Sequence, residues 1–432
     1  MNVFFKKKIT LLLFIALYQI QATEQAPVSN PTIQKAQATP VQATIATNQL
    51  PPTERPIQTI IVSGKNEIPV GATLPLKGEN AVIGTPVFDG MSLYFNKIKT
   101  EQLPFTYQLT TLEDQADVQT RQENIKALAK TSPIILSLLE TEALTTNIDS
   151  IKEKNILALF PIEGSKKFRT NTHNNIIFFR ANHEDELQAL VDYSIQSLDK
   201  KKIAIFYEES EWGKDCLESL KQILSKRNIP LVAEGHYPQN TLNITKGAKK
   251  IVDQDPEAIV CVAHSRPAYN FIQHVVNNGN HKTVFLCLST LVSTQDTLRR
   301  SRGISIVTSA VVPDPRNSSL PIAKEFREDM QRYTPNKPLS PFAFEGYINA
   351  ALITECTKLI QMPITPQKII KTLEGLKHVK FKGLEINFDE STRTLCKQIW
   401  INTGHPKKEW LSWPLHKQKK SAQPMPNNQV IP

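Results

Sequence analysis

The fold class is decided by Ile68-Pro-Val-Gly-Ala-Thr-Leu-Pro75-Leu-Lys-Gly78, followed by Gly84-Thr-Pro-Val-Phe-Asp-Gly90. The apolar first part predicts a buried strand, and the second part predicts the start of a helix after a loop that contains glycine. Thr85 is expected to cap this helix, and Pro86 suits its first position, where a missing N–H has no effect. A strand that enters a helix in this way leaves free N–H groups at the carboxyl edge of a sheet, where a small ligand can bind.

The same strand–helix unit recurs almost without interruption from residue 68 to about residue 310. Strands such as 133–139, 202–207 and 258–262 are apolar on both faces, and amphipathic helices separate them. This pattern is typical of parallel sheets that helices cover on each side. The pattern contains about eleven strands, too many for one open sheet of this kind, so we expect an α/β protein with two lobes.

The N-terminus has the parts of a secretory signal peptide. A basic region at Lys6, Lys7 and Lys8 precedes an apolar segment over 9–20, and Ala22 offers a small residue for cleavage. The apolar segment is shorter than the roughly twenty residues that a membrane span needs. Because no cysteine lies near the cleavage region, we expect residues 1–22 to be removed and the mature protein to be soluble, without a lipid anchor, in the periplasm or another extracytoplasmic compartment.

Two polar segments flank the predicted folded body. Residues 23–58 are rich in Thr, Gln, Ala and Pro, and residues 413–432 combine proline with several lysines. Such segments cannot bury enough apolar surface to offset their ordering entropy. We therefore expect a disordered linker over 23–58 and a disordered basic tail over 413–432, with about 350 residues left for two ordinary domains.

The charge and cysteine patterns exclude several classes of protein. The net charge of +10 includes the three lysines near the N-terminus, and basic runs such as 200–202 lie beside acidic residues and lack interleaved aromatics. A nucleic-acid groove is therefore not expected. The five cysteines show no close-spaced pairing pattern, and the offset in Cys261-x-x-His264 points the two side chains in opposite directions from a strand. We expect buried cysteines, no metal site and no cofactor.

No phosphate loop, Gly-x-Ser-x-Gly elbow, His-Glu-x-x-His motif or Gly-x-Gly-x-x-Gly fingerprint occurs in the chain. The sequence therefore gives no indication of an enzyme.

Four segments in register resemble the type I periplasmic binding proteins, specifically their leucine/isoleucine/valine-binding branch. These segments are Val70-Gly-Ala-Thr-Leu-Pro-Leu-Lys-Gly78 with Asp89-Gly90, Lys202-Ile-Ala-Ile-Phe-Tyr-Glu-Glu-Ser-Glu-Trp-Gly213, Phe344-Glu-Gly-Tyr-Ile-Asn-Ala-Ala351 and Phe381-Lys-Gly-Leu-Glu-Ile-Asn-Phe-Asp389. No single segment is specific, but their order and spacing cover residues 66–412.

This resemblance implies two Rossmann-like lobes with parallel sheets, joined by a three-strand hinge and closing on a ligand. The first lobe would comprise 59–180 plus 311–378, and the second lobe 181–310 plus 379–412. The implied function is that of an exported solute-binding protein, monomeric, that delivers a small ligand to an ABC-type permease in the inner membrane. The alternative is a regulatory or scaffold protein on the same fold, similar to the penicillin-binding-protein activators, and the long polar linker favours it.

The resemblance also implies which residues contact the ligand, because in this family the contacts come from loops at the carboxyl ends of strands. Carried over by position, the candidates are Glu140, Thr141, Glu163, Gly164, Ser165, Trp212, His264, Ser265, Ser289 and Thr290. Each has a simpler interpretation: Thr141 and Ser165 could cap helices, Trp212 could cover a helix start, and the two glutamates could interact with helix N-termini.

The chain departs from the amino-acid binders of this branch at two points. Glu140 and Glu163 stand where relatives hold a ligand carboxylate, and Ser289 and Thr290 stand where relatives carry an acidic partner for the ligand ammonium. Two carboxylates would repel a ligand carboxylate. We therefore expect a neutral or cationic ligand with Trp212 against its apolar or cationic face, unless nearby lysines at 166–167 neutralise the acids.

Export gives the first testable prediction. Protein purified from the producing cell should lack the first 22 or so residues and carry no acyl group, since the apolar segment is short and no cysteine lies near the cleavage region. Intact-mass spectrometry measures both properties. A retained N-terminal segment, or a mass increment from acylation, would contradict the prediction.

Overall fold

The computed structural model describes residues 58–61, 67–78, 80–98, 101, 103, 105–153, 155–279, 281–293, 304–414 and 430–431. All of them belong to one unit that spans residues 50–432. The predicted signal peptide, nearly all of the predicted linker and most of the predicted tail lie outside the described residues.

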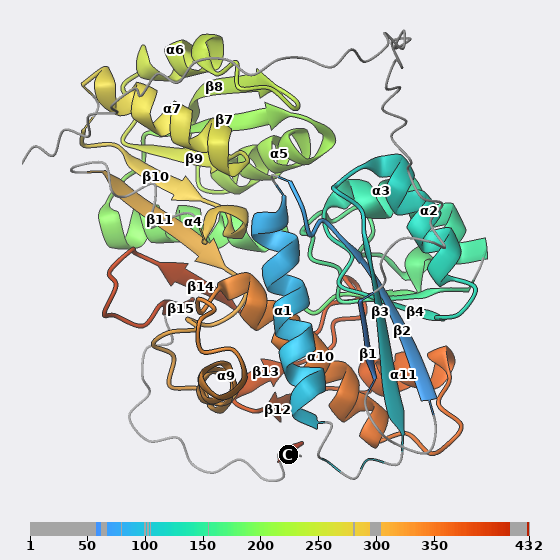
Figure 1. Cartoon of the computed structure of the whole chain (residues 1–432). Coiled ribbons are helices and arrows are strands. Elements are labelled where there is room, and N and C mark those ends of the chain that lie inside the picture. The colour runs from blue at the N-terminus through green and yellow to red at the C-terminus, as the bar shows by residue number, and fades with distance from the viewer. Residues whose placement is uncertain are drawn as a thin grey trace, which may run out of the picture. The chain divides into compact units, whose positions relative to one another are not determined.

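The first lobe is built around a sheet with the strand order β1-β3-β2-β4-β5-β6 (Figure 1). Its strands are β1 (Gln58–Ile61), β2 (Glu67–Leu74), β3 (Thr106–Glu113), β4 (Ile134–Leu136), β5 (Leu157–Leu159) and β6 (Ile176–Ile177). Only β1 runs antiparallel to its neighbour in this sheet. One face packs on α2 (Val118–Leu128) and α3 (Thr141–Glu153), and the other on α1 (Ala81–Lys97), α9 (Pro321–Tyr333), α10 (Pro341–Lys358) and α11 (Pro366–Glu374). A short helix, η3 (Asn171–His173), precedes β6.

The second lobe is built around a sheet with the order β15-β14-β11-β10-β9-β7-β8. Its strands are β7 (Ile203–Glu209), β8 (Leu231–Pro238), β9 (Ala258–Val262), β10 (Val284–Cys287), β11 (Ser305–Ala310), β14 (Ile399–Asn402) and β15 (Leu411–Trp413). The five strands from β7 to β11 are parallel, and β14 and β15 extend the sheet in antiparallel pairing. The helices are α4 (His183–Leu198), α5 (Glu211–Ser225), α6 (Thr245–Val252), α7 (Ser265–Asn277) and the short η4 (Ser289–Leu291).

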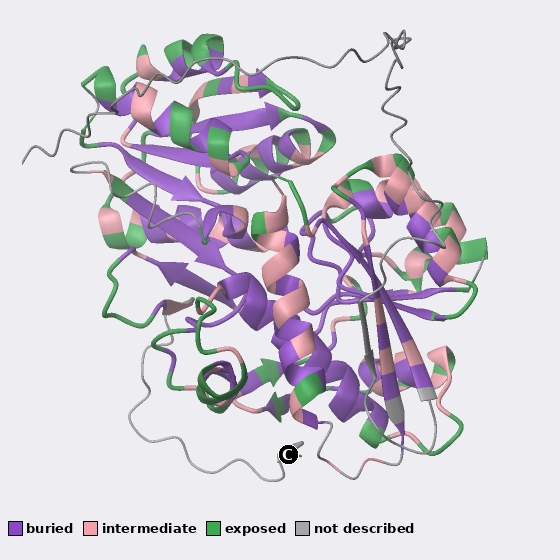
Figure 2. Cartoon of the chain, viewed as in Figure 1, coloured by how far each residue is buried: buried purple, intermediate pink, exposed green. Residues whose placement is uncertain are grey.

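Alternating side chains explain why helices cover both faces of the second sheet. Ile205 and Val260 belong to the hydrophobic cluster with α4 and α5, whereas Phe206 and Ile259 belong to the cluster with α6 and α7. Successive residues of a strand point to opposite faces, so a strand that is apolar throughout needs a cover on each side. The central strands β7, β9 and β10 are accordingly buried along most of their length (Figure 2). The predicted two-lobed α/β fold is confirmed.

The predicted start of α1 is wrong by about one turn. The helix begins at Ala81, where the amides of Ile83 and Gly84 donate to the Asn80 carbonyl, so Thr85 and Pro86 lie inside the helix. A Cβ on Gly84 would lie 2.2 Å from the Pro75 carbonyl oxygen, so glycine allows the helix to start directly against the loop. One face of the helix is buried, with Val87, Met91, Tyr94, Phe95 and Ile98 along it.

Helices α1 and α10 run side by side through the centre of the unit (Figure 1). Their backbones approach closely at two glycines: a Cβ on Gly90 would lie 1.8 Å from the Ala343 carbonyl oxygen, and one on Gly346 would lie 2.2 Å from that of Val87. Helix α10 is buried on all sides from Pro341 to Thr357. The contact between these helices therefore depends on the absence of side chains at Gly90 and Gly346.

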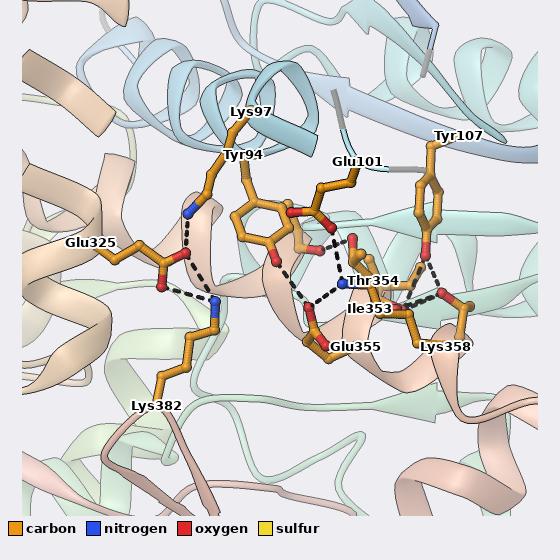
Figure 3. A network of polar contacts seen from close by, with 12 residues as sticks. Tyr94, Lys97, Glu101, Tyr107, Glu325, Ile353, Thr354, Glu355, Lys358 and Lys382 are labelled. Carbon is orange, nitrogen blue, oxygen red and sulfur yellow. Dashed lines mark hydrogen bonds and ion pairs between the residues drawn. The ribbon is translucent and has the colours of Figure 1, made fainter. Parts of the chain in front are cut away.

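A network of polar contacts joins α1, α9 and α10 in the first lobe (Figure 3). Lys97 of α1 and Lys382 both pair with Glu325 of α9. Lys358 of α10 pairs with Glu355 at 2.9 Å, and the Tyr94 hydroxyl donates to the same carboxylate at 3.3 Å. Since Lys382 lies in the turn between β12 (Val379–Phe381) and β13 (Leu384–Ile386), the network ties this hairpin to the first lobe.

The β12–β13 hairpin packs with the first lobe and not with the seven-stranded sheet. It forms a separate sheet with β16 (Val430–Ile431), which pairs in parallel with β12. The side chains that it buries in the first-lobe cluster are Val379, Phe381, Leu384 and Ile386. The sequence prediction assigned 379–412 wholly to the second lobe; within that range, β14 and β15 do join the second sheet. The difference arises because short amphipathic strands do not reveal which sheet they cover.

Three described connections run between the lobes, at 178–182, 311–320 and 387–398. The first and third are bonded to each other through their backbones. The Phe178 amide donates to the Arg393 carbonyl at 2.9 Å, and the amides of Leu395 and Cys396 donate to Phe178 and Phe179 at 2.9 and 2.8 Å. These two crossovers therefore form a small ribbon where the lobes join.

The α1–α10 contact gives a stability prediction. Gly90→Ala should lower the free energy of unfolding by at least about 2 kcal/mol, because the new methyl group would overlap the Ala343 carbonyl. Gly375→Ala is the matched control: its nearest atoms lie 3.4 Å from the added Cβ, so stability should change by less than about 1 kcal/mol. Urea unfolding followed by circular dichroism measures both. Equal stability of the two variants would contradict the proposed close approach.

Candidate functional site

Both sheets share one topology, and this locates the candidate site. In the first lobe the parallel strands are ordered β3-β2-β4-β5-β6, and in the second lobe β8-β7-β9-β10-β11. In each sheet the order reverses beside the first strand, between β2 and β4 and between β7 and β9. Ligands of open α/β sheets bind at the carboxyl ends of the strands at such switch points. Glu140 and Thr141 follow β4, Trp212 follows β7, and His264 and Ser265 follow β9.

The structure brings together the first-lobe candidates. The Thr141 hydroxyl donates to Glu163 Oε2 at 3.3 Å, and the Ser165 amide donates to the same oxygen at 2.8 Å. The Glu140 amide donates to the Ile162 carbonyl at 3.2 Å, which joins the loops after β4 and β5. These residues therefore form one hydrogen-bonded cluster.

Glu140 has a strained backbone and a partly exposed side chain. Its φ of 75° lies in the left-handed region, which is costly for a residue with a side chain. Asn80 donates to Oε1 at 3.1 Å, and the Arg121 guanidinium lies 3.6 Å from Oε2 while bonding Asp114 at 3.0 Å. Burial raises the pKa of Glu140, and Arg121 and His264 of the second lobe oppose that shift. The side chain is 24% exposed.

Glu163 is held inside the protein and has a different part in the cluster. Its side chain is fully buried, and Arg169 Nη2 lies 3.9 Å from Oε1. Burial raises the pKa of Glu163, and Arg169 and the Ser165 amide oppose the shift. Burial also lowers the pKa of Arg169 to about 10, so the guanidinium stays charged at neutral pH. The buried Glu163 carboxylate therefore stabilises the loop that carries it.

Trp212 lies between two histidines. Its ring centroid is 6.0 Å from that of His183 and 5.4 Å from that of His264. Its Nε1 is buried and has no acceptor in the described part of the chain. Gly164 contacts the other side of His183, where an added Cβ would come within 2.3 Å of the ring. Ser265 begins α7 directly after His264. The aromatic group therefore connects the Gly164 loop to the second lobe.

Ser289 and Thr290 do not join this group. Ser289 is buried beside the crossovers, where its hydroxyl accepts from Arg180 and its amide donates to Glu186 Oε2 at 2.8 Å. The neighbouring Thr290 hydroxyl is buried and has no partner among the residues that the structure covers. Neither position carries an acid, but the carboxylate of Glu186, from α4, contacts Ser289.

The cations near the two glutamates are arginines that the sequence reasoning missed. Lys166 pairs with Glu184 at 3.5 Å and Lys167 with Glu211 at 2.6 Å, both at the surface, so these lysines do not neutralise the site acids. Arg121 lies beside Glu140 and Arg169 beside Glu163. A buried carboxylate requires a cation or several hydrogen-bond donors. The sequence signal for these arginines was therefore the presence of two acids, Glu140 and Glu163, at positions expected to be buried.

The two lobes contact each other directly beside the cluster. The Ser165 hydroxyl donates to Asp215 Oδ2 at 3.4 Å, and the Lys167–Glu211 pair links the same loop to α5. Asp215 and Glu211 both belong to the first half of α5, the helix that carries Trp212.

Within the described ranges, no group of three or more His, Cys, Asp or Glu side chains could hold a metal ion. The five cysteines are free and buried, as the sequence predicted. None of the helices in the described residues combines the length and hydropathy of a membrane span.

A family model described as periplasmic binding protein matches residues 67–402. The chain belongs to this family. Its members are extracytoplasmic binding proteins and not enzymes, and the fold is that of the type I periplasmic binding proteins. Among curated proteins, none matches the chain.

Solved structures of periplasmic binding proteins share the fold of the chain at low identity. A possible leucine/isoleucine/valine-binding protein from Rhodopirellula baltica SH 1 has a TM-score of 0.72 at 23% identity, covering 81% of this chain and 98% of that one. The isoleucine complex of a branched-chain amino acid transporter substrate binding protein from Streptococcus pneumoniae has a TM-score of 0.70 at 14% identity, covering 81% and 99%. A solute binding protein from R. palustris in complex with 4-hydroxybenzoate has a TM-score of 0.69 at 16% identity, covering 80% and 95%.

The buried Glu163 gives a prediction for the dependence of stability on pH. Its pKa is raised in the folded protein, so the folded state binds its proton more tightly than the unfolded chain does. The stability of the parent protein should therefore fall, relative to that of Glu163→Gln, as the pH rises above about 4, the ordinary range of an unfolded glutamate. Urea unfolding at several pH values, with the exposed Glu211→Gln as control, measures the difference. A Glu163→Gln difference that is constant with pH would contradict the prediction.

Proposed function

We propose that the protein is the solute-binding component of an ABC-type importer and captures a small polar ligand between its lobes. The observation that carries the proposal is the placement of Glu140 after β4, and of Trp212 and His264 after β7 and β9, at the switch points of the two sheets, with the Trp212 and His264 rings 5.4 Å apart. His264 acts electrostatically on the Glu140 carboxylate across the two lobes. Membership of the periplasmic binding proteins supports the same function.

A neutral or cationic ligand fits the charges of this cluster. Arg121 is shared by Asp114 and Glu140, so two carboxylates and one guanidinium leave one net negative charge there. A ligand carboxylate would be repelled by this negative charge. It would also lose hydration free energy in a partly desolvated site, and no new interaction would compensate for that loss. An amide, a polyol or an amine can instead donate to Glu140, and Trp212 can pack against its apolar or cationic face.

Of the two glutamates, Glu140 is the ligand contact in this proposal. Its side chain is 24% exposed, whereas that of Glu163 is fully buried behind Thr141 and Ser165. The left-handed backbone at Glu140 is the kind of strain that persists where the surrounding structure fixes a functional side chain.

Calorimetry with leucine, glutamate, small carboxamides and polyamines tests the proposal. Carboxamides or amines should bind and the two amino acids should not. Glu140→Gln should weaken the binding of a cationic compound about tenfold or more, because the neutral amide replaces a charged acceptor. Glu142→Gln is the matched control, because Glu142 is exposed and lies two residues further along the chain, in the first turn of α3. This variant should bind like the parent. Micromolar binding of leucine or glutamate that Glu140→Gln leaves unchanged would refute the ligand assignment.

The second candidate function is that of a regulatory or scaffold protein on the same fold. The observation that favours it is the direct bonding of the lobes through Ser165–Asp215 and Lys167–Glu211. Small-angle scattering in the calorimetry mixtures separates the two functions: an importer component becomes more compact when a compound binds, and a scaffold keeps its radius of gyration.

A further inference from the structure

Arg169 uses its whole guanidinium to join the candidate site to the hinge. On the site side, Nε donates to the Ser165 carbonyl at 3.2 Å and Nη2 donates to the Glu163 carbonyl at 2.9 Å. On the hinge side, Nη1 donates at 2.8 Å to both the Arg180 carbonyl of the first crossover and the Thr394 hydroxyl of the third. The side chain is 1% exposed, so these bonds are made away from water.

The planar group is also fixed from its face. The guanidinium carbon of Arg169 lies 4.0 Å from the ring centroid of Phe178, which belongs to the first crossover. The Phe178 backbone is in turn bonded to Arg393 and Leu395 of the third crossover. Arg169 therefore touches the two crossovers at the points where they are bonded to each other, and the guanidinium geometry sets their positions relative to the site loop.

Arg180 extends this connection into both lobes. Its guanidinium lies 3.7 Å from Glu345 of α10 in the first lobe and 3.5 Å from Glu186 of α4 in the second. It also donates to the Ser289 hydroxyl, and the Ser309 hydroxyl donates to Glu186 at 2.7 Å. A displacement of the first crossover therefore changes buried contacts in both lobes at once.

We infer that Arg169 is a positioning residue that couples the Glu163–Ser165 loop to the hinge, so that the arrangement of the site and the angle between the lobes change together. The meaning of this coupling for ligand capture rests on the proposed function, but the coupling itself belongs to the two-lobed fold. It requires the forked geometry of the guanidinium and not only its charge, since four of its acceptors are neutral oxygens on three different segments.

Interlobe distances measured by double electron–electron resonance test the inference without any ligand. Spin labels are attached through Glu153→Cys in α3 and Lys250→Cys in α6, two exposed positions, while the five native cysteines are buried. Arg169→Lys keeps the charge beside Glu163 but cannot make the fork, so it should shift or broaden the distance distribution about as much as Arg169→Met does. Thr394→Val removes one acceptor at the third crossover and should shift the distribution in the same direction.

Arg227→Lys is the matched control, because Arg227 bonds only Ile223 and Asp192 within the second lobe in the described contacts. It should leave the distribution unchanged. The inference is overturned if Arg169→Lys retains the parental distribution, which would reduce Arg169 to a counter-ion of Glu163. If neither Arg169 variant folds, as judged by circular dichroism, Thr394→Val decides: a parental distribution overturns the inference. A failure of the calorimetric test of ligand binding would leave this outcome unaffected.

Discussion

The need to pair charge that is buried where the two lobes join is the constraint on which the rest of the structure depends. A guanidinium cannot lose its proton at neutral pH, so Arg169 and Arg180 must find acceptors wherever the fold takes them. Arg169 finds them on the site loop and on two crossovers, and Arg180 finds them on one helix from each lobe. Segments far apart in the sequence are thereby required to converge, because leaving one of these groups unpaired would cost several kcal/mol.

The same constraint shapes the chemistry of the candidate site. Glu163 is buried beside Arg169 and stabilises its loop, whereas the Glu140 side chain is partly exposed. Arg121 divides its interaction between Glu140 and Asp114, so the accessible end of the cluster remains acidic. One acidic residue thus serves the fold and the other is available for recognition, although the two occupy equivalent positions at the ends of neighbouring strands.

Much of the fold follows from local patterns. Runs that are apolar on both faces predicted the parallel strands, because a side chain alternates between faces and both faces are covered. The start of α4 is fixed locally by a capping box between Asn182 and Asp185. The start of α1 was misplaced because the close approach of Gly84 to Pro75 is a tertiary contact, and the threonine–proline pair that follows it resembles a helix start. The β12–β13 hairpin was expected with the second lobe because nothing local distinguishes the sheet that a short strand covers.

Periodicity in the sequence determined the two-lobed α/β fold, and the resemblance to the type I periplasmic binding proteins indicated the loops that carry Glu140, Glu163, Trp212 and His264. Only the tertiary structure decided which of the two glutamates is accessible, that Ser289 belongs to the crossovers, and that Arg121 and Arg169 are the cations beside the acids. The physical reason is that periodicity reports which face of an element is buried. The pairing of buried charges depends instead on distances between segments that the chain order does not specify.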